Sequence, residues 1–252
     1  MAAFTELSLF SGAGGGLLAT KHLLGWHTVC YVEWDKYAVK VLKARIADGM
    51  LDNAPIWDNA FTFNGRPWAG LVDVITAGFP CQPFSRAGNM LAENDPRNGW
   101  PATIRIIGEV RPQFAFLENV PDILSFPYFG TILGDLAALG YDAKWEIVSA
   151  CSIGAPHTRE RLFIVAYANG IRTTGGGIGG NGSASSTERE TQKRRKNRFA
   201  NSRLGKAQIW AEHEADIVRM ADGMGSKMDR VRAIGNGQVP AVVAEAWRRL
   251  TP

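Results

Sequence analysis

The fold is decided at residues 7–16, which read LSLFSGAGGG. Leu7–Phe10 predicts a short strand, the glycines that follow predict a loop, and residues 17–24 have the composition of a helix. A strand, a glycine loop and a helix in this order make a ligand site, because glycines let the backbone approach closely and the helix N-terminus offers unpaired N–H groups to an anion. A dinucleotide fingerprint would need a third glycine where Leu17 stands, so a pyrophosphate is not the favoured anion.

The next predicted strand carries acids at its end. His27–Val32 is rich in β-branched and aromatic residues, and Glu33, Trp34 and Asp35 follow before a helix beginning near Lys36. An acid about 20 residues beyond the glycines is where such folds place the carboxylate that accepts hydrogen bonds from ribose hydroxyls, which favours Glu33 for that role. Asp35 is better placed to cap the helix. Trp34 is a candidate to pack against an adenine.

A cysteine lies between two prolines in the segment 78–85, GFPCQPFS, directly after the apolar run 72–77. Prolines continue neither a helix nor a strand ladder, so Cys81 is expected on a stiff loop at a strand end, where open α/β sheets bind ligands. That position suits a nucleophile, although a free cysteine is also common as a small buried hydrophobic residue. The polar stretch 85–99 predicts a mobile lid or a plain surface loop.

A carboxylate ends another apolar strand that starts at Phe114. Glu118 is expected to emerge at the same sheet edge as Cys81, because the carboxyl ends of parallel strands meet at one edge. The alternative is a cap for the following helix, and the two interpretations are equally favoured for an isolated Glu-Asn pair.

The second half of the chain predicts two further strands, at residues 143–149 and 161–168. The segment 156–161 between them predicts alternate basic side chains on one face of an extended chain, or a salt-bridged edge strand. Residues 235–240 predict a sharp turn into a last helix at 241–250, with a proline at its start.

Composition limits the class of protein. The chain has 252 residues, of which 46% are hydrophobic and 21% charged, and this predicts one main domain. Its net charge of +4 and its pI of about 9.0 favour a polyanionic partner. The excess is concentrated in residues 170–206, where nine basic residues face two glutamates. This glycine-rich segment predicts a solvated linker or an arm that contacts phosphates.

The three cysteines, Cys30, Cys81 and Cys151, match no zinc pattern and leave an odd thiol, which fits a reducing cytosol and predicts no metal site. No basic region precedes an apolar one at the N-terminus, and no apolar run approaches the roughly 20 residues of a membrane span. We therefore expect a soluble, cytoplasmic protein.

In this order, these residues resemble the DNA (cytosine-5)-methyltransferase family, and the resemblance covers residues 7–168 and about 230–250. Its specificity lies in the ordered set of motifs at predicted strand ends, above all the cysteine loop together with Glu-Asn-Val. The motifs are Phe10-Ser-Gly-Ala-Gly-Gly, Glu33, Gly78-Phe-Pro-Cys-Gln-Pro-Phe-Ser85, Glu118-Asn-Val120, Arg159-x-Arg161 and Gly235-Asn236.

The resemblance implies an α/β fold of the Rossmann-like, S-adenosylmethionine-dependent methyltransferase type, with a mostly parallel, doubly wound sheet and a small, irregular recognition segment. Residues 1–168 would form the catalytic and cofactor-binding domain. Residues 169–225 would form a short, basic, glycine-rich target-recognition segment that is partly flexible. Residues 226–252 would return to the catalytic domain. The recognition region is unusually short for this family.

The implied reaction is methyl transfer from S-adenosylmethionine to C5 of cytosine in DNA, in restriction-modification or phage host evasion. Cytosine C5 is too poor a nucleophile to attack a sulfonium methyl group, so the Cys81 thiolate would first add to C6 of a flipped-out base. A protonated Glu118 would relieve the charge that develops around N3 and O2. Arg161 would meet O2, and Arg159 would orient Glu118 or the cysteine.

By the same resemblance, S-adenosylmethionine occupies the glycine loop, with S-adenosylhomocysteine as its product and no metal. Phe10 would stack on adenine and Glu33 would hold the ribose. The implied cofactor-binding residues are Phe10, Ser11, Gly12, Ala13, Gly14, Gly15, Glu33, Trp34, Asp58, Gly78, Pro80 and Asn236. The implied DNA-binding residues are Gln82, Ser85, Arg86, His157, Arg194 and Arg195. His157 stands where the family usually has glutamine.

The implied partner is double-stranded DNA, with a cognate restriction endonuclease or a partner chain that supplies specificity left open. An RNA cytosine-5 methyltransferase acting on tRNA shares the cysteine loop and the Glu-Asn-Val motif, but this sequence lacks the Cys-Phe-Thr signature of that branch. A DNA-binding homologue that is inactive or partner-dependent is a further alternative. A nicotinamide dehydrogenase would leave Cys81 and Glu118 without a role.

Overall fold

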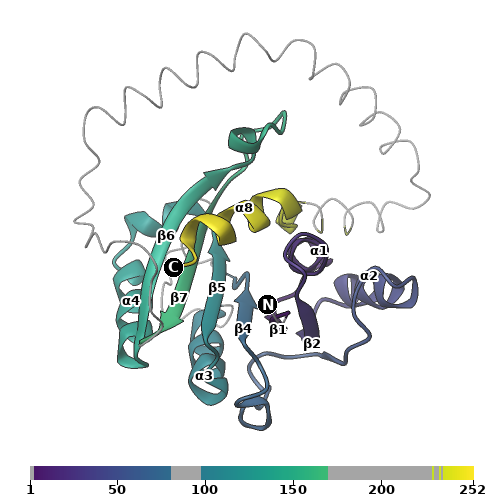
Figure 1. Cartoon of the computed structure of the whole chain (residues 1–252), viewed down its shortest axis with the longest axis horizontal. Coiled ribbons are helices and arrows are strands. Elements are labelled where there is room, and N and C mark those ends of the chain that lie inside the picture. The colour runs from purple at the N-terminus through teal and green to yellow at the C-terminus, as the bar shows by residue number, and fades with distance from the viewer. Residues whose placement is uncertain (1–2, 81–97, 170–228, 230–232, 234) are drawn as a thin grey trace.

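The computed structural model describes residues 3–80, 98–169 and 235–252, together with Asp229 and Ala233. Its centre is one seven-stranded sheet in the order β3-β2-β1-β4-β5-β7-β6 (Figure 1). The strands are β1 (Thr5–Leu9), β2 (His27–Val32), β3 (Ile56–Trp57), β4 (Val74–Ala77), β5 (Phe114–Asn119), β6 (Tyr141–Ser149) and β7 (Glu160–Ala168). β1 to β5 pair in parallel, whereas β7 is antiparallel to both β5 and β6. The predicted, mostly parallel α/β sheet is therefore confirmed.

Helices cover both faces of this sheet, as a doubly wound fold requires. α1 (Gly15–His22) and α8 (Pro240–Leu250) lie on one face, and α3 (Trp100–Val110) and α4 (Tyr128–Ala138) lie on the other (Figure 1). α2 (Lys36–Ala47) packs through Leu42 against Tyr31 of β2. In the described part of the chain, the connections contain three short 3-10 helices: η1 (Arg66–Trp68), η4 (Pro121–Ser125) and η5 (Ala150–Ile153).

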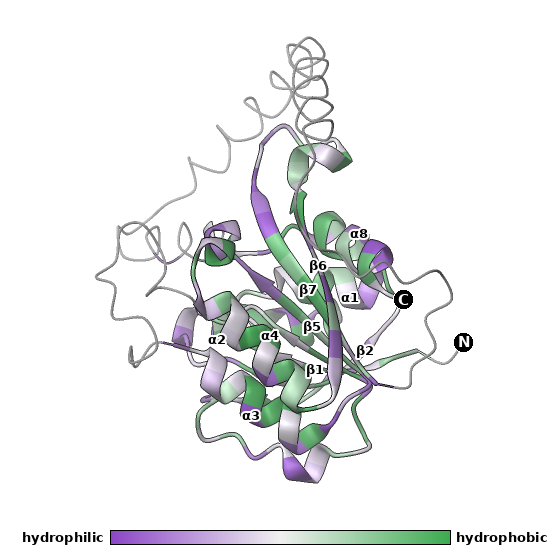
Figure 2. Cartoon of the chain, turned by 90° about the vertical axis from the view of Figure 1, so that its left-hand side faces the viewer, coloured by the Kyte–Doolittle hydropathy of each residue, from purple (hydrophilic) through white to green (hydrophobic). Residues whose placement is uncertain are grey.

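The inner strands are apolar along most of their length because both of their faces are covered. β7 buries residues 162–167 and is hydrophobic over most of its course (Figure 2). α3 has the pattern of a helix with one buried face, since residues three and four apart lie on the same side. Its buried residues are Trp100, Ala102, Thr103, Ile106, Ile107 and Val110. The buried side chains form two large clusters, one on each face of the sheet, and a smaller one between α1, β2 and α2.

A buried carboxylate ties α1 to the strands beneath it. Glu6 of β1 is 1% exposed, and burial raises the pKa of its carboxyl group. It accepts hydrogen bonds from the hydroxyls of Thr20 at 2.7 Å, Thr28 at 3.0 Å and Thr76 at 2.6 Å. Because these threonines come from α1, β2 and β4, the cluster fixes α1, and the glycine loop before it, over the sheet.

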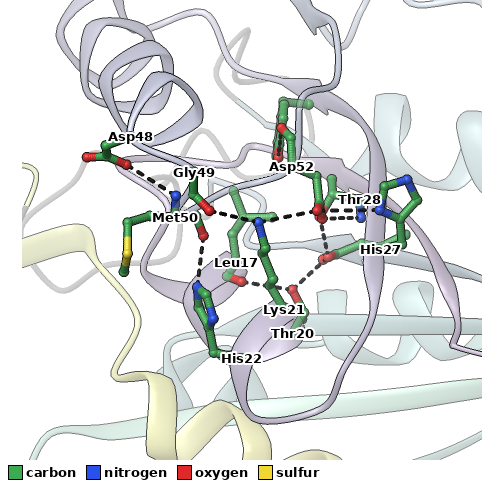
Figure 3. Close-up of polar contacts among 12 residues, drawn as sticks. Leu17, Thr20, Lys21, His22, His27, Thr28, Asp48, Gly49, Met50 and Asp52 are labelled. Carbon is green, nitrogen blue, oxygen red and sulfur yellow. Dashed lines mark hydrogen bonds and ion pairs between the residues drawn. The ribbon is translucent and has the colours of Figure 1, made fainter.

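A second polar cluster holds the segment after α2 against α1 and β2 (Figure 3). The Asp52 carboxylate accepts from the Thr28 backbone N–H at 2.9 Å and pairs with Lys21 Nζ at 3.3 Å. Lys21 also donates to the Gly49 carbonyl at 3.2 Å, and a ring nitrogen of His22 lies 2.8 Å from the Met50 carbonyl oxygen. These contacts anchor the chain between α2 and β3 on the side of the sheet that carries α1.

The last helix packs through aromatic contacts. Trp247 of α8 is 7% exposed and lies edge-on to Trp26, Phe114 and Phe116, at ring distances of 4.7 to 5.3 Å. α8 therefore docks on strands β5 and β7 and beside α1, and this brings the segment before it to the carboxyl ends of the strands.

Replacing Trp247 with Ala is expected to lower the free energy of unfolding by about 3–5 kcal/mol, because it leaves a large cavity under α8. Urea denaturation followed by circular dichroism would measure the change. Trp145→Ala is the matched control, because Trp145 is 43% exposed and has Phe129 as its aromatic neighbour, so a loss of about 1 kcal/mol is expected. Equal losses in the two variants would contradict the docking role of Trp247.

The structure bears on the predictions for segment 156–161 and for the domain boundaries. β7 lies between β5 and β6, so the edge-strand alternative for 156–161 is wrong, and of the predicted extended segment residues 156 and 157 form a bend and only Glu160 and Arg161 belong to a strand. The target-recognition segment 169–225 lies outside the described residues except for Asn169, so the domain division stays a prediction. No helix among the described residues is long and apolar enough to span a bilayer.

Candidate active site

A cavity of about 690 Å³ opens at the carboxyl ends of β1, β2, β4 and β5. The end of each strand contributes a short segment to the cavity wall. These segments are Phe10–Gly12, Glu33–Asp35, Gly78–Pro80 and Glu118–Val120. Open α/β sheets bind ligands at this edge, and the volume is in the usual range for small-molecule sites. The cavity therefore unites the strand-end motifs that the sequence singles out.

The glycine loop turns sharply at the cavity wall. Phe10 has a positive φ of 52°, a conformation that non-glycine residues adopt only when the surroundings hold them there, and Gly12 has a φ of 57°. Gly14, with a φ of 87°, precedes α1 without any side-chain cap, so the first N–H groups of the helix are left for another acceptor. A Cβ on Gly14 would lie 3.3 Å from Leu51, and Gly14 is not among the residues lining the cavity.

Glu33 braces this loop from the neighbouring strand. Its carboxylate accepts from the Gly12 N–H at 2.7 Å and from the Asp35 N–H at 2.8 Å. Burial raises the pKa of Glu33, and these two N–H groups oppose the rise. Asp35 instead accepts from the N–H groups of Tyr37 and Ala38, both at 2.9 Å, which confirms it as the cap of α2.

Two exposed aromatic side chains stand at the wall of the cavity. Trp34 is 74% exposed and Phe61 is 51% exposed, although both line it. Asp58 is exposed and does not line it, and its place is taken by Asn59, Ala60 and Phe61. The sequence reasoning missed Phe61, and the only available signal was an aromatic residue close behind the predicted acid.

Glu118 lies at the end of β5 with both carboxylate oxygens engaged. Oε1 pairs with Arg161 Nε at 2.9 Å, and Oε2 accepts from Gln238 Nε2 at 3.4 Å. Burial raises the pKa of Glu118 above its usual 4.5, in spite of the opposing charges of Arg161 and Arg159. Burial thus favours the neutral acid, whereas the two donors favour the carboxylate, and both donors hold the group in place beside the cavity.

Arg159 contacts the backbone before α8 and its charge also acts on Glu118, so its expected orienting role stays a prediction. Its terminal nitrogens donate to the carbonyls of Gly235 and Gly237, both at 2.7 Å. These contacts anchor the segment that contains Asn236, which is exposed and lines the cavity. Gln238 follows in the same segment and reaches Glu118, a contact that no sequence signal indicated.

Some of the remaining predicted site residues are described by the structure, and the others lie outside the described part of the chain. His157 is exposed in the bend before β7 and does not line the cavity, while Ser11, Ala13, Gly15, Gly78 and Pro80 all line it. The residues that lie outside the described part of the chain are Cys81, Gln82, Ser85, Arg86, Arg194 and Arg195. Cys81 is covalently joined to Pro80 of the cavity wall. No group of three potential metal ligands occurs among the described residues.

Known sequences resemble this chain over most of its length. The family model for the C-5 cytosine-specific DNA methylase matches residues 4–239. The type II methyltransferase M.NgoMIV of Neisseria gonorrhoeae is 32% identical over 173 residues, which cover 66% of this chain and 52% of that protein. M1.ScrFI of Lactococcus lactis subsp. cremoris is 33% identical over 176 residues, covering 66% and 42%. The chain spans about half the length of the curated relatives it matches.

Solved structures share the fold. A Spodoptera frugiperda DNMT2 mutant superposes with a TM-score of 0.59 at 24% identity, over 71% of this chain and 54% of that one. A putative DNA modification methyltransferase encoded within an E. coli prophage gives a TM-score of 0.52 at 26% identity, over 66% and 47%.

Proposed function

Because the chain belongs to the C-5 cytosine-specific DNA methylase family, we propose that it transfers a methyl group from S-adenosylmethionine to C5 of cytosine in DNA. The observation that carries the proposal is the cavity, which joins the glycine loop and Glu33 to the Glu118–Arg161 pair. A cofactor site and a buried acid thus open into one space. Pro80 lines this cavity, and Cys81 is the next residue in the sequence.

The residues present fit S-adenosylmethionine. The uncapped N-terminus of α1 suits the carboxylate of its methionine part, and Glu33 suits the ribose hydroxyls. Phe10, Trp34 and Phe61 offer aromatic surface to the adenine. When bound, the cofactor supplies a methyl group on a positively charged sulfur, and a metal has no role in this chemistry.

The protein residues make the weakly nucleophilic cytosine reactive. The Cys81 thiolate forms a bond to C6, and the electron pair of the C5–C6 double bond becomes available at C5. Protonated Glu118 donates a hydrogen bond to N3, and Arg161 stabilises the charge that develops at O2. After C5 has taken the methyl group, a base removes the C5 proton, and the Cys81–C6 bond breaks to restore the thiolate and the double bond.

Duplex DNA is the proposed substrate, with the target base flipped into the cavity because C6 cannot be reached in a stacked duplex. The relatives named type II methyltransferases support a setting in restriction-modification or phage host evasion. The basic segment 170–206 supplies positive charge for phosphates. We also propose that the chain works with a cognate restriction endonuclease or with a partner chain that supplies sequence specificity.

The test is incubation of the whole chain with S-adenosylmethionine and unmethylated genomic DNA, followed by bisulfite sequencing. We expect 5-methylcytosine in one shared sequence context. A parallel incubation with tritium-labelled cofactor compares DNA with unmodified tRNA as methyl acceptors. Label in tRNA alone would make the chain an RNA methyltransferase, and label in neither would favour an inactive or partner-dependent homologue.

Trp34→Ala is expected to weaken S-adenosylmethionine binding about three- to tenfold, because it removes one aromatic face at the proposed adenine position. The change should leave the fold intact, since Trp34 is largely exposed. Isothermal titration calorimetry measures the dissociation constant, with Trp145→Ala as an exposed tryptophan away from the cavity. Unchanged affinity in Trp34→Ala would remove this residue from the proposed adenine site.

A further inference from the structure

The C-terminal segment reaches into the active-site cavity through one amide side chain. Gln238 lies just before α8, lines the cavity and donates through Nε2 to Glu118 Oε2 at 3.4 Å. Arg161 engages the other oxygen of the same carboxylate. Among the described residues, Gln238 is thus the hydrogen-bond partner of the Glu118 oxygen that Arg161 leaves free.

Glycines on two other segments make room for Gln238. A Cβ on Gly15 would lie 2.5 Å from the Gln238 carbonyl oxygen, and one on Gly16 would collide with its side-chain Oε1. A Cβ on Gly78 would lie 3.3 Å from Gln238 Nε2 and 3.2 Å from Glu118 Oε2. The amide therefore occupies the space that these glycines leave between the start of α1 and the segment that follows β4.

The backbone of this segment is held by a separate contact. Arg159 donates to the carbonyls of Gly235 and Gly237, directly before Gln238. Arg159 lies just before β7 and Arg161 is the second residue of that strand, and the charges of both lower the pKa of Glu118. Arg161 pairs with it directly, whereas Arg159 fixes the segment that presents Gln238.

We propose that Gln238 is a positioning residue for Glu118, an inference that rests on the proposed methyl transfer. An amide has a donor and an acceptor of nearly the same size, so a half-turn exchanges them without changing the space it fills. With Nε2 toward Glu118, Gln238 pairs with the carboxylate. With Oε1 toward it, Gln238 would accept a hydrogen bond from the neutral acid. The structure has the first arrangement, so Gln238 holds Glu118 in place and favours its carboxylate form.

This role differs from packing in a way that the pH dependence of the reaction reveals. A reaction that needs protonated Glu118 loses rate as the pH rises through the pKa of that acid. Replacing Gln238 with a neutral side chain that makes no hydrogen bonds removes a donor that favours the Glu118 carboxylate. The pKa of Glu118 then rises, and the loss of rate moves to higher pH. A negative charge of the same shape moves it in the same direction.

The experiment measures single-turnover methyl transfer to DNA between pH 5 and 10 for wild type, Gln238→Met and Gln238→Glu. We expect the Gln238→Met rate at its own optimum to fall about tenfold, because an oxygen of Glu118 loses its partner. We expect the falling limb to lie at higher pH than in wild type for both variants. Cofactor affinity, measured by calorimetry, should change by less than about threefold, which shows that the cavity is intact.

Two outcomes would overturn the inference. A lower rate with an unshifted limb in both variants would reduce Gln238 to a packing residue. A Gln238→Glu enzyme identical to wild type would do the same, because it keeps the shape and changes only hydrogen bonding and charge. An inactive wild-type chain would instead overturn the proposed function, so the two failures are distinguishable.

Discussion

Cys81→Ser is expected to lose methyl transfer by at least about four orders of magnitude while still binding S-adenosylmethionine. A thiol has a pKa near 8.5 and is partly ionised at neutral pH, whereas a serine hydroxyl is not, so the attack on C6 has no nucleophile. Transfer of tritiated methyl groups to DNA measures the rate, and calorimetry measures cofactor binding.

Cys151→Ser is the matched control for this experiment. Cys151 is half-buried, its Sγ lies 3.0 Å from Ser149 Oγ, and it does not line the cavity. Its replacement should therefore leave the rate within about twofold of wild type. Comparable activity in Cys81→Ser and wild type would eliminate the covalent step, and equal losses in the two variants would point to a general effect of removing a thiol.

The strand ends could be predicted because local signals agree there. Residues 7–16 combine an apolar run with glycines, and the structure has β1, a left-handed turn and α1 in that place. The strand predicted at 161–168 is β7, which begins one residue earlier. The antiparallel direction of β7 and its place inside the sheet have no local signal, because they depend on which strands meet across the chain. For this reason the edge-strand alternative for 156–161 is wrong.

The candidate site likewise contains residues that local sequence signals predict and residues that only long-range packing brings in. Glu33 and Asp35 lie within three residues of the end of β2 and Glu118 lies at the end of β5, so a parallel sheet brings them to one edge without further information. The roles of Arg159 and Gln238 come from the docking of α8, which joins residues 78 and 120 positions apart in the sequence. Contacts over that distance leave no periodic pattern in a single sequence. Phe61 rather than Asp58 lines the cavity, and no periodic pattern in the sequence indicates that either.

Glu118→Gln is expected to slow methyl transfer by about 10²- to 10⁴-fold, the usual range for a general acid. The amide keeps the size of the side chain and donates a hydrogen bond to N3, but it cannot give up a proton as charge develops. Arg161 also loses its carboxylate partner at 2.9 Å, which weakens its orientation toward O2. Single-turnover kinetics with wild type and variant at several pH values measure the loss, and a change of less than threefold would contradict the role of Glu118.

The same variant tests the state of the acid in the free protein. Burial holds the folded pKa of Glu118 above 4.5, so the folded state binds its proton more tightly than the unfolded chain does. This carboxyl group therefore costs no stability below pH 4.5 and opposes folding increasingly as the pH rises from 4.5 through the folded pKa. Glu118→Gln lacks this dependence, so its free energy of unfolding relative to wild type should rise across that window. A relative stability that falls instead would mean that Arg161 holds Glu118 as a carboxylate, and the proton for N3 would have to come from another group.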